Sequence, residues 1–476
     1  MKVKNTMEIE QDEALEPVSP SAQYLKSSVL SFTILCVLEL EVPIDVYTIM
    51  TLVKDVFLPI NHRFSSIMVS SKGEKKWKRV EVNLKDHVNV PVFQSDMSTD
   101  YYDEVFNEYL SKLAMEQFPE NRPLWEIHIV KYPTRNAAEN LIFKLHHSLG
   151  DGYSLMGALL SCLQRLDNPS MPLTFPSRQP NSRPSRNSND LFRPVSQFVS
   201  GLINTAYDFG LNLLKSSLIK DDKSPIRSGE DGVEFRPIVL TTTTFSMDHL
   251  KQIKDRLKVT INDVITGIVI FGTRLYMQRV NEDSGQAKCT TLVLLNTRAI
   301  GGYKSVNEMI KPNAEMPWGN RFAFLQVVIP KLSTQELNNP IKFVKEAHQL
   351  IKRQRNSASV YLTGHFLDAI RQIRGPEAVA RSIHGSLHNS SLTISNMMGP
   401  VEPMALANRP IKGLYFAVAG APQSLSVTMV SYVGKLRISM GVEKGFIDPD
   451  KFKSCIEKAF EAIFKAALES PAETKL

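Results

Sequence analysis

The residues best suited to chemistry lie together in one stretch, Leu141–Gly152, which reads LIFKLHHSLGDG. Alternation along a strand places His147 on the apolar side, so we expect it to continue a buried face, and it places His146 on the other side. Gly150 and Gly152 allow a tight turn, after which leucines recur at helical spacing. The pattern therefore predicts a histidine between the end of a strand and the start of a helix.

A histidine in this position suits general base catalysis, because its ordinary pKa of about 6.5 leaves the neutral form available at cellular pH. Asp151, four residues later, can organise the turn that holds the ring. With ten histidines in the chain, a bare HxxxD is expected roughly 0.5 times by chance, and the flanking His146 and Gly152 make the full pattern about a thousandfold rarer. The alternative is a pair of core histidines before a turn.

The chain that must position these residues has 476 residues, which suggests two or three domains at roughly 100–200 residues each. We expect a first unit over 1–167, in which strand-like runs alternate with helices such as one near 103–118. A Pro- and Ser-rich linker should follow over 168–234. A second α/β unit is expected over 235–476.

The second unit has its own helix and strand signals. Ser246 is a candidate helix cap, a further helix is expected from Asn262 to Arg279, and Asp448-Pro449 should open the last helix. Gly434 marks the turn of a predicted hairpin. The expected strands cover 290–295, 323–329, 391–394, 414–419 and 425–440, the last being the hairpin.

Composition excludes several classes of protein. The net charge is +7, an excess that could attract a phosphorylated co-substrate or an anionic membrane, or that simply makes a slightly basic protein. No nucleic-acid-binding module is visible. The four cysteines are far apart and lack CxxC spacing, which argues against a zinc site or a disulfide scaffold and fits a reducing compartment. The apolar run 29–40 is too short to span a bilayer.

Several motifs resemble those of a known family. His146–Gly152 resembles the HHxxxDG motif of the CoA-dependent acyltransferase superfamily. Arg122–Glu126 resembles the RPLWE segment of wax ester synthase/diacylglycerol acyltransferases, most closely those of plants. Thr260–Val264 is similar to their ND motif, and Ser395–Pro400 to their SNVPGP segment, with Met397-Met398 in place of Val-Pro. The DFGWG motif of BAHD acyltransferases is absent, which weighs against a phenolic or alkaloid acceptor.

This resemblance implies an α/β (α+β) fold of two chloramphenicol-acetyltransferase-like domains with mixed sheets and an active-site tunnel at their interface. It implies an enzyme that takes fatty acyl-CoA as co-substrate and binds no cofactor or metal. The acceptors would be long-chain alcohols, giving wax esters such as those of cuticular wax, and diacylglycerol, giving triacylglycerol. It also implies the cytosolic face of the endoplasmic reticulum membrane, with the plasma membrane as an alternative. Another alcohol acceptor and a non-catalytic lipid-binding relative stay open.

Within this resemblance, His147 is the general base and His146 and Gly152 support the motif. Asp151 should point away from the substrate and pair with Arg298, because a carboxylate beside a buried histidine needs a partner. Ser395 and Asn396 are candidates for an oxyanion or substrate loop, although Ser, Asn, Gly and Pro are also ordinary turn residues.

Other motif residues have structural explanations. We expect Asn262 and Asp263 to cap a helix more than to take part in catalysis. Trp125 is better explained as a core aromatic than as a platform for substrate.

An amphipathic helix is expected over 191–214, with Phe198, Leu202 and Phe209 on its apolar stripe. Its internal charges disfavour a membrane span, so it would lie on a membrane surface or pack on the protein's own core.

Overall fold

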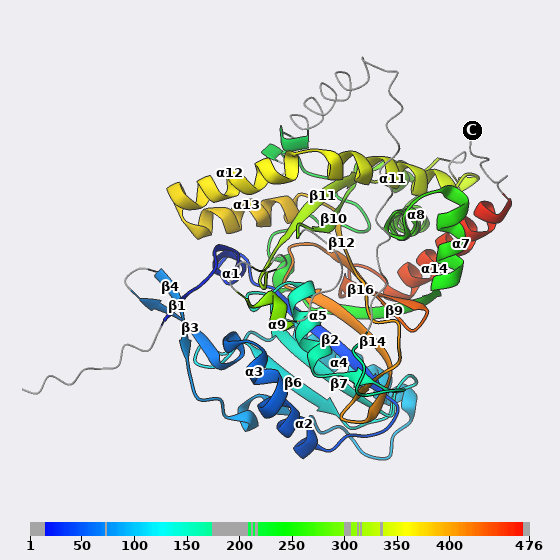
Figure 1. Ribbon diagram of the computed structural model, residues 1–476. Coiled ribbons are helices and arrows are strands. Elements are labelled where there is room, and N and C mark those ends of the chain that lie inside the picture. Colours follow the sequence, from blue (N-terminus) through cyan, green and yellow to red (C-terminus); the bar gives the residue numbers. More distant parts are fainter. Residues whose placement is uncertain are drawn as a thin grey trace, which may run out of the picture.

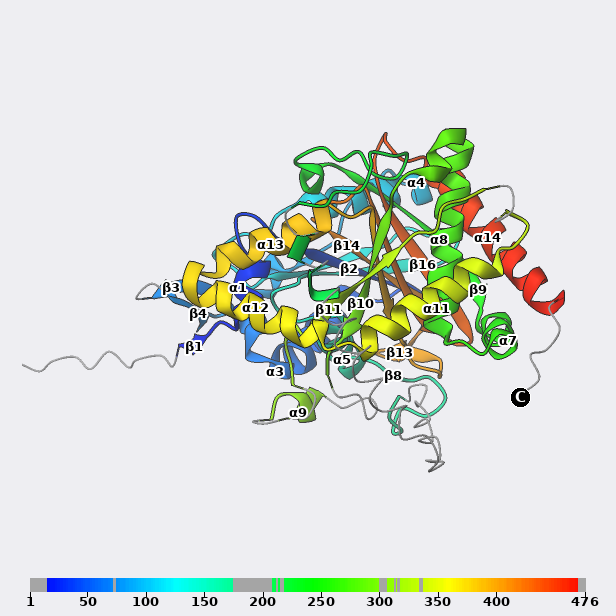
Figure 2. The ribbon, with the colours of Figure 1, turned by 90° about the horizontal axis from the view of Figure 1, so that it is seen from above.

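The computed structural model describes residues 15–71, 74–173, 208–210, 213–214, 218–298, 306–311, 314, 317–333 and 337–469. Two large mixed sheets lie side by side, and helices cover them (Figures 1 and 2). The predicted fold class is confirmed, because each unit combines a mixed sheet with packed helices.

The first sheet contains the strand that leads to the histidine pair. Its order is β5 (Val88–Asn89), β6 (Trp125–Val130), β7 (Glu139–His146), β2 (Thr33–Leu40), β14 (Arg409–Ala419), β13 (Met404–Leu406) and β8 (Gln164–Arg165). Every residue of β7 and β2 is buried, so both faces of the central strands are covered.

This sheet crosses the domain boundary expected from sequence. β13 and β14 belong to the predicted second unit, yet β14 pairs with β2 along its length in the first sheet. Without β14, the buried strand β2 would present an unpaired edge inside the protein. Strand pairing at this distance along the chain has no signature in local sequence.

Helices and a small separate sheet surround the first large sheet. The helices are α1 (Pro20–Leu25), α2 (Val46–Leu52), η1 (Val53–Phe57), α3 (Leu58–Ile60), η2 (His62–Ser65), η3 (Leu84–Asp86), α4 (Thr99–Met115) and α5 (Gly152–Ser161). The small antiparallel sheet has the order β1 (Glu16–Pro17), β4 (Glu74–Arg79), β3 (Ser66–Ser71) and projects from one end of the molecule (Figure 1).

The second sheet has the order β11 (Phe322–Val328), β10 (Thr290–Asn296), β12 (Leu392–Met397), β15 (Leu425–Tyr432), β16 (Lys435–Glu443) and β9 (Ile238–Ser246). Its helices are η4 (Val233–Phe235), α7 (Met247–Leu257), α8 (Ile261–Val280), η5 (Glu282–Gln286), α9 (Val306–Met309), α11 (Ile341–Asn356), α12 (Ser359–Arg374), α13 (Pro376–His388) and α14 (Pro449–Glu469). Helix α8 lies centrally because Gly267 and Gly272 admit α11 and α14 so closely that a Cβ at either glycine would meet side chains at 2.6 Å.

Several local predictions are confirmed. Ser246 caps α7, Gly434 takes a positive φ of 70° at the tip of the β15–β16 hairpin, and Asp448 precedes α14, which begins at Pro449. Helices α11, α12 and α13 were not foreseen from the sequence.

The linker expected over 168–234 is only partly a linker. Asp221 is buried and accepts hydrogen bonds from the backbone and side chain of Thr290 at 2.6 and 3.0 Å. Arg227 is buried and donates to the carbonyl of His388 at 2.8 Å. Residues 218–234 therefore pack on the second unit, which corrects the sequence prediction for this part.

Most of the predicted helix 191–214 lies outside the described residues. Of the part that is described, Asp208 forms an ion pair with Arg353 of α11 at 2.8 Å. The ring of Phe209 packs edge-on against Phe366 of α12 at 6.0 Å. This end of the predicted apolar stripe therefore contacts the protein itself.

Within the described ranges, no helix is both long enough and apolar enough to cross a membrane. In the same part of the chain, no group of three or more His, Cys, Asp or Glu side chains could hold a metal ion. The four cysteines are buried and unpaired.

Candidate active site

His147 lies where the two units meet. Its backbone N–H donates to the carbonyl of Phe32 in the first unit at 2.9 Å, and its ring contacts Asn320 from the second. The rings of Phe32 and Phe322 approach the imidazole edge-on at 6.0 and 5.6 Å. The side chain is only 7% exposed, so the surroundings of the ring are apolar on two sides and polar at Asn320.

Asn320 determines which ring nitrogen of His147 carries the proton. Its Nδ2 lies 3.0 Å from the carbonyl oxygen of His147, which can only accept, so the amide NH₂ must face that oxygen. Its Oδ1 then faces Nδ1 of His147 at 2.8 Å, and an amide oxygen can only accept. Nδ1 therefore carries the proton, and Nε2 keeps its lone pair.

His146 is held in the opposite tautomer. Its Nδ1 accepts the backbone N–H of Ser148 at 3.1 Å, so the ring proton lies on Nε2, which contacts Oγ of Ser31 at 3.0 Å. Burial lowers the pKa of His146 to about 3. Both ring nitrogens thus have partners in the protein, as expected for a structural histidine.

This contrast corrects one step of the sequence argument. Alternation suggested that only His147 would lie on a buried face, but His146 is also buried. The central strand is covered on both sides, so burial does not distinguish the two histidines. Their hydrogen-bond partners do.

The predicted ion pair of Asp151 is present. Arg298 donates to the carboxylate through Nη1 at 2.6 Å and Nη2 at 3.1 Å, and both side chains are buried. Asp151 also caps α5 by accepting the N–H of Ser154 at 3.0 Å. The pair joins the two units directly beside the turn that follows β7, and these partners occupy the carboxylate.

A short segment before β11, residues 317–321, contacts the turn at several points. The Trp318 indole N–H donates to the carbonyl of Leu149 at 2.8 Å, and the Arg321 backbone N–H donates to Asp151 at 2.9 Å. Gly319 has a φ of 123°, a conformation that favours glycine, and its carbonyl accepts from Arg298 at 2.7 Å. Together with Asn320, this segment supplies the second half of the site.

The electrostatic balance keeps His147 neutral. Burial lowers its pKa below the ordinary value, and the nearby charge of Asp151 and the hydrogen bonds of the ring oppose that shift only in part. A neutral, correctly protonated imidazole can accept a proton at Nε2. The arrangement is therefore competent for general base catalysis.

The ND and SNMMGP segments meet near the turn. Asn396 Nδ2 donates to Oδ1 of Asn262 at 3.4 Å. Met397 lies against Gly152, where an added Cβ would come 2.5 Å from its sulfur, so the glycine is needed for this approach. The segment that carries Ser395 and Asn396 thus contacts the start of α5.

Asp263 has the structural role expected from the sequence, but the N-cap of α8 is neither Asn262 nor Asp263. Thr260 is the N-cap of α8, and Asp263 completes a capping box with it. Asp263 also contacts Nδ1 of His348 at 2.8 Å.

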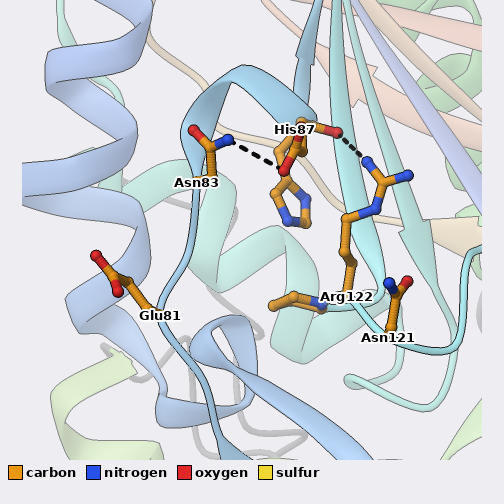
Figure 3. Close-up of a pocket in the computed structure, with 7 residues that line it drawn as sticks. Glu81, Asn83, His87, Asn121 and Arg122 are labelled. Atoms are coloured by element: carbon orange, nitrogen blue, oxygen red, sulfur yellow. Dashed lines mark hydrogen bonds between the residues drawn. The ribbon is translucent and has the colours of Figure 1, made fainter.

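The RPLWE segment supports the strands beside the histidines. The carbonyl of Leu124 accepts the backbone N–H of His146 at 3.0 Å. Trp125 is fully buried, as predicted, and its indole donates to the carbonyl of Phe64 at 2.8 Å. Arg122 lines a polar surface pocket of about 420 Å³ and donates to the carbonyl of Asp86 at 2.9 Å (Figure 3). These contacts indicate a structural role.

Comparison with known proteins agrees with this geometry. Two sequence models of one family match the chain: the wax ester synthase/diacylglycerol acyltransferase catalytic domain at 68–265 and the WS/DGAT C-terminal domain at 318–464. The chain belongs to the wax ester synthase/diacylglycerol acyltransferase family. It is thus a member of an acyltransferase family whose substrates include acyl-CoA.

Relatives of this family match along nearly the whole chain. Wax ester synthase/diacylglycerol acyltransferase 11 of Arabidopsis thaliana is 28% identical over 95% of this chain and 96% of its own. Wax ester synthase/diacylglycerol acyltransferase 6 of the same plant is 29% identical, over 97% and 95%.

Solved structures share the fold. The wax ester synthase/diacylglycerol acyltransferase from Marinobacter aquaeolei VT8 is 13% identical, covers 95% of this chain and 99% of its own, and superposes with a TM-score of 0.58. The first condensation domain of the calcium-dependent antibiotic synthetase is 12% identical, covers 97% of each chain, and has a TM-score of 0.56.

Sequence reasoning missed the contribution of residues 317–322 to this family member's site. Asn320 stands in Pro317-Trp318-Gly319-Asn320, which reads as an ordinary turn. Nothing local ties it to a histidine 173 positions earlier. A tryptophan next to glycine and asparagine was the available signal, although it predicts a turn and not a partner.

The Asp151–Arg298 pair generates a stability prediction. Arg298→Met leaves a buried carboxylate without its cation and should lower the free energy of unfolding by about 3–5 kcal/mol, measured by urea denaturation. Adding Asp151→Asn should restore part of that loss, because no uncompensated charge remains. An Arg298→Met protein as stable as the wild type would contradict the role of the pair.

The Asn320 contacts generate a kinetic prediction. Asn320→Ala should lower kcat by about 10²-fold, the usual cost of misplacing a reacting group, with little change in KM. Asn320→Asp keeps an acceptor for Nδ1–H but adds a negative charge, which raises the pKa of His147. The acid limb of kcat/KM, expected below about pH 6.5 in the wild type, should then move to higher pH.

The pH profile separates positioning from folding. If Asn320 has only a structural role, Asn320→Asp should lower activity but leave the acid limb of kcat/KM at the pH of the wild type. Far-ultraviolet circular dichroism should show both variants folded.

Proposed function

We propose that this chain transfers fatty acyl groups from acyl-CoA to long-chain alcohols, forming wax esters, and also to diacylglycerol, forming triacylglycerol. The observation that carries the proposal is a neutral, buried histidine at the junction of the two units, with its Nδ1 proton committed to Asn320. Membership of the wax ester synthase/diacylglycerol acyltransferase family supports the substrate classes.

In the proposed mechanism, Nε2 of His147 removes the proton from the acceptor hydroxyl as its oxygen attacks the thioester carbonyl. The tetrahedral intermediate collapses, the C–S bond breaks, and the imidazolium returns the proton to the CoA thiolate. The acyl group moves directly to the alcohol oxygen. A single base of this kind contributes about 10²–10⁴-fold.

The remaining rate enhancement requires orientation and donors aimed at the oxyanion. Asn396 is our candidate donor, with Ser395 beside it, because Met397 of the same segment packs on Gly152 at the start of α5. The bond between Asn396 and Asn262 is long at 3.4 Å, so the amide could turn to a substrate oxygen at little cost.

We propose that the enzyme works on the cytosolic face of the endoplasmic reticulum membrane. Long-chain alcohols and diacylglycerol are nearly insoluble in water and reside in bilayers, whereas acyl-CoA carries charged phosphates. An enzyme that joins them benefits from a site with apolar walls such as Phe32 and Phe322.

Replacing each histidine tests the mechanism. His147→Ala should lower ester formation from labelled acyl-CoA by about 10²–10⁴-fold, while His146→Ala should retain more activity. Both variants must be shown to be folded. Equal losses in two folded variants would defeat the assignment of the base, and an absence of ester from the wild type would favour a lipid-binding protein.

The acceptor preference is tested by competition. With a long-chain alcohol and diacylglycerol offered together, we expect more wax ester than triacylglycerol, because the chain resembles plant members of the family. Separation of the labelled products measures the ratio. If triacylglycerol predominates, the predicted acceptor preference is wrong. If only a sterol or a short alcohol is esterified, the proposed class of acceptor is wrong.

A further inference from the structure

One end of the molecule combines exposed basic and exposed apolar side chains. The β1–β4–β3 sheet, helix α1 and the tip where α12 turns into α13 lie side by side at this end in both views (Figures 1 and 2). We call this surface, formed by β4, α1, residues 26–31 and the α12–α13 tip, the basic end.

Direct contacts join the parts of the basic end. Lys75 of β4 donates through Nζ to the carbonyl of Lys26 after α1 at 3.1 Å. Ser28 donates through Oγ to Glu377 at the start of α13 at 3.4 Å. The end is therefore one continuous surface.

Positive charge is concentrated on β4. Four of its six residues are Lys or Arg. Trp77 is buried, so alternation directs Lys76 and Lys78 to the opposite, outer face of the strand. At the α12–α13 tip, Arg374 is exposed as well. The acidic side chains of this end are fewer than the basic ones. The acidic ones are Glu16, Glu74, Glu120, Asp368 and Glu377, and the basic ones are Lys26, Lys75, Lys76, Lys78, Arg79, Arg371 and Arg374.

Large apolar side chains project from α12. Ile373, in the last turn, is 81% exposed; Tyr361 and Leu362, 70% and 42% exposed, lie in the first turn, at the other end of the helix. Ile373 stands one residue before Arg374, at the tip itself. A protruding isoleucine beside an arginine and a basic strand matches the mixed chemistry of a bilayer surface, where apolar groups enter among headgroups and cations meet phosphates.

The basic end also leads to the apolar side of the catalytic site. One hydrophobic cluster joins Leu25 of α1 and Ala380 of α13 to Phe32, and Phe322 packs against it. Phe32 and Phe322 are the rings that flank His147. A packed apolar cluster therefore lies between the basic end and the histidine.

We propose that the basic end docks on an anionic lipid surface, with Ile373 inserted among the headgroups and Lys76 and Lys78 facing lipid phosphates. This inference rests on the proposed function, because the acceptors of that function reside in bilayers. It places the docking on β4 and the α12–α13 tip, whereas the sequence had offered 191–214 as one of two alternatives, a membrane-surface helix or a helix packed on the protein's own core.

Vesicle sedimentation of the full chain tests the proposal. The vesicles are phosphatidylcholine alone or phosphatidylcholine with phosphatidylserine. Lys76→Gln with Lys78→Gln should lower partitioning onto the anionic vesicles by about 25-fold, at about fivefold for each basic residue near the surface. Ile373→Asp should lower it roughly tenfold on both vesicle types.

Matched controls lie on α14, at the opposite end of the molecule (Figure 1). Lys458→Gln with Lys465→Gln, and Leu468→Asp, make the same changes at exposed positions and should leave vesicle binding unchanged. Binding is measured without substrate, and His147→Ala should bind like the wild type. Failure of docking is thereby distinguished from failure of the proposed catalysis.

Several outcomes would overturn the proposal. The proposal is wrong if the wild-type protein binds neither type of vesicle, or if the variants of the basic end bind as well as the wild type. It is also wrong if the control variants on α14 lose as much binding as the variants of the basic end. Sedimentation velocity adds a further one: if Ile373→Asp dissociates a dimer and leaves vesicle binding intact, the surface joins two copies of the chain.

Discussion

The buried carboxylate of Asp151 is the constraint on which the site depends. A charge removed from water needs a partner in the protein, and the partner, Arg298, belongs to the other unit. The same carboxylate caps α5 and accepts the backbone N–H of Arg321. One ionised group therefore holds together the turn after β7, the start of α5 and the segment before β11. These contacts fix the position of the two units relative to each other near the histidine.

Two adjacent histidines take different roles because their hydrogen-bond partners differ. A backbone N–H accepted at Nδ1 holds His146 with its proton on Nε2. The Asn320 oxygen at Nδ1 holds His147 with its proton there and leaves Nε2 as a base. Neither charge nor burial separates the two rings, since both are buried and the pKa of each is lowered.

The apolar surroundings of His147 favour the neutral form of its ring. Burial penalises the imidazolium and so keeps the resting ring neutral, while Phe32 and Phe322 provide surfaces compatible with alkyl chains. The charge of Asp151 raises the pKa of the His147 ring, which would lower the cost of the imidazolium in the proposed mechanism. The same environment therefore suits both the lipid substrates and the proton transfer that we propose.

The sequence by itself determined the motif-bearing turn, the mixed α/β class, the cap at Ser246, the start of the last helix at Pro449, and the family, because these depend on residues close together in the chain. It also indicated Arg298 through resemblance. Only the tertiary structure decided that β14 completes the first sheet, that 218–234 packs on the second unit, and that Asn320 sets the tautomer of His147. Those outcomes depend on contacts between residues far apart in sequence, and local propensity carries no information about such pairings.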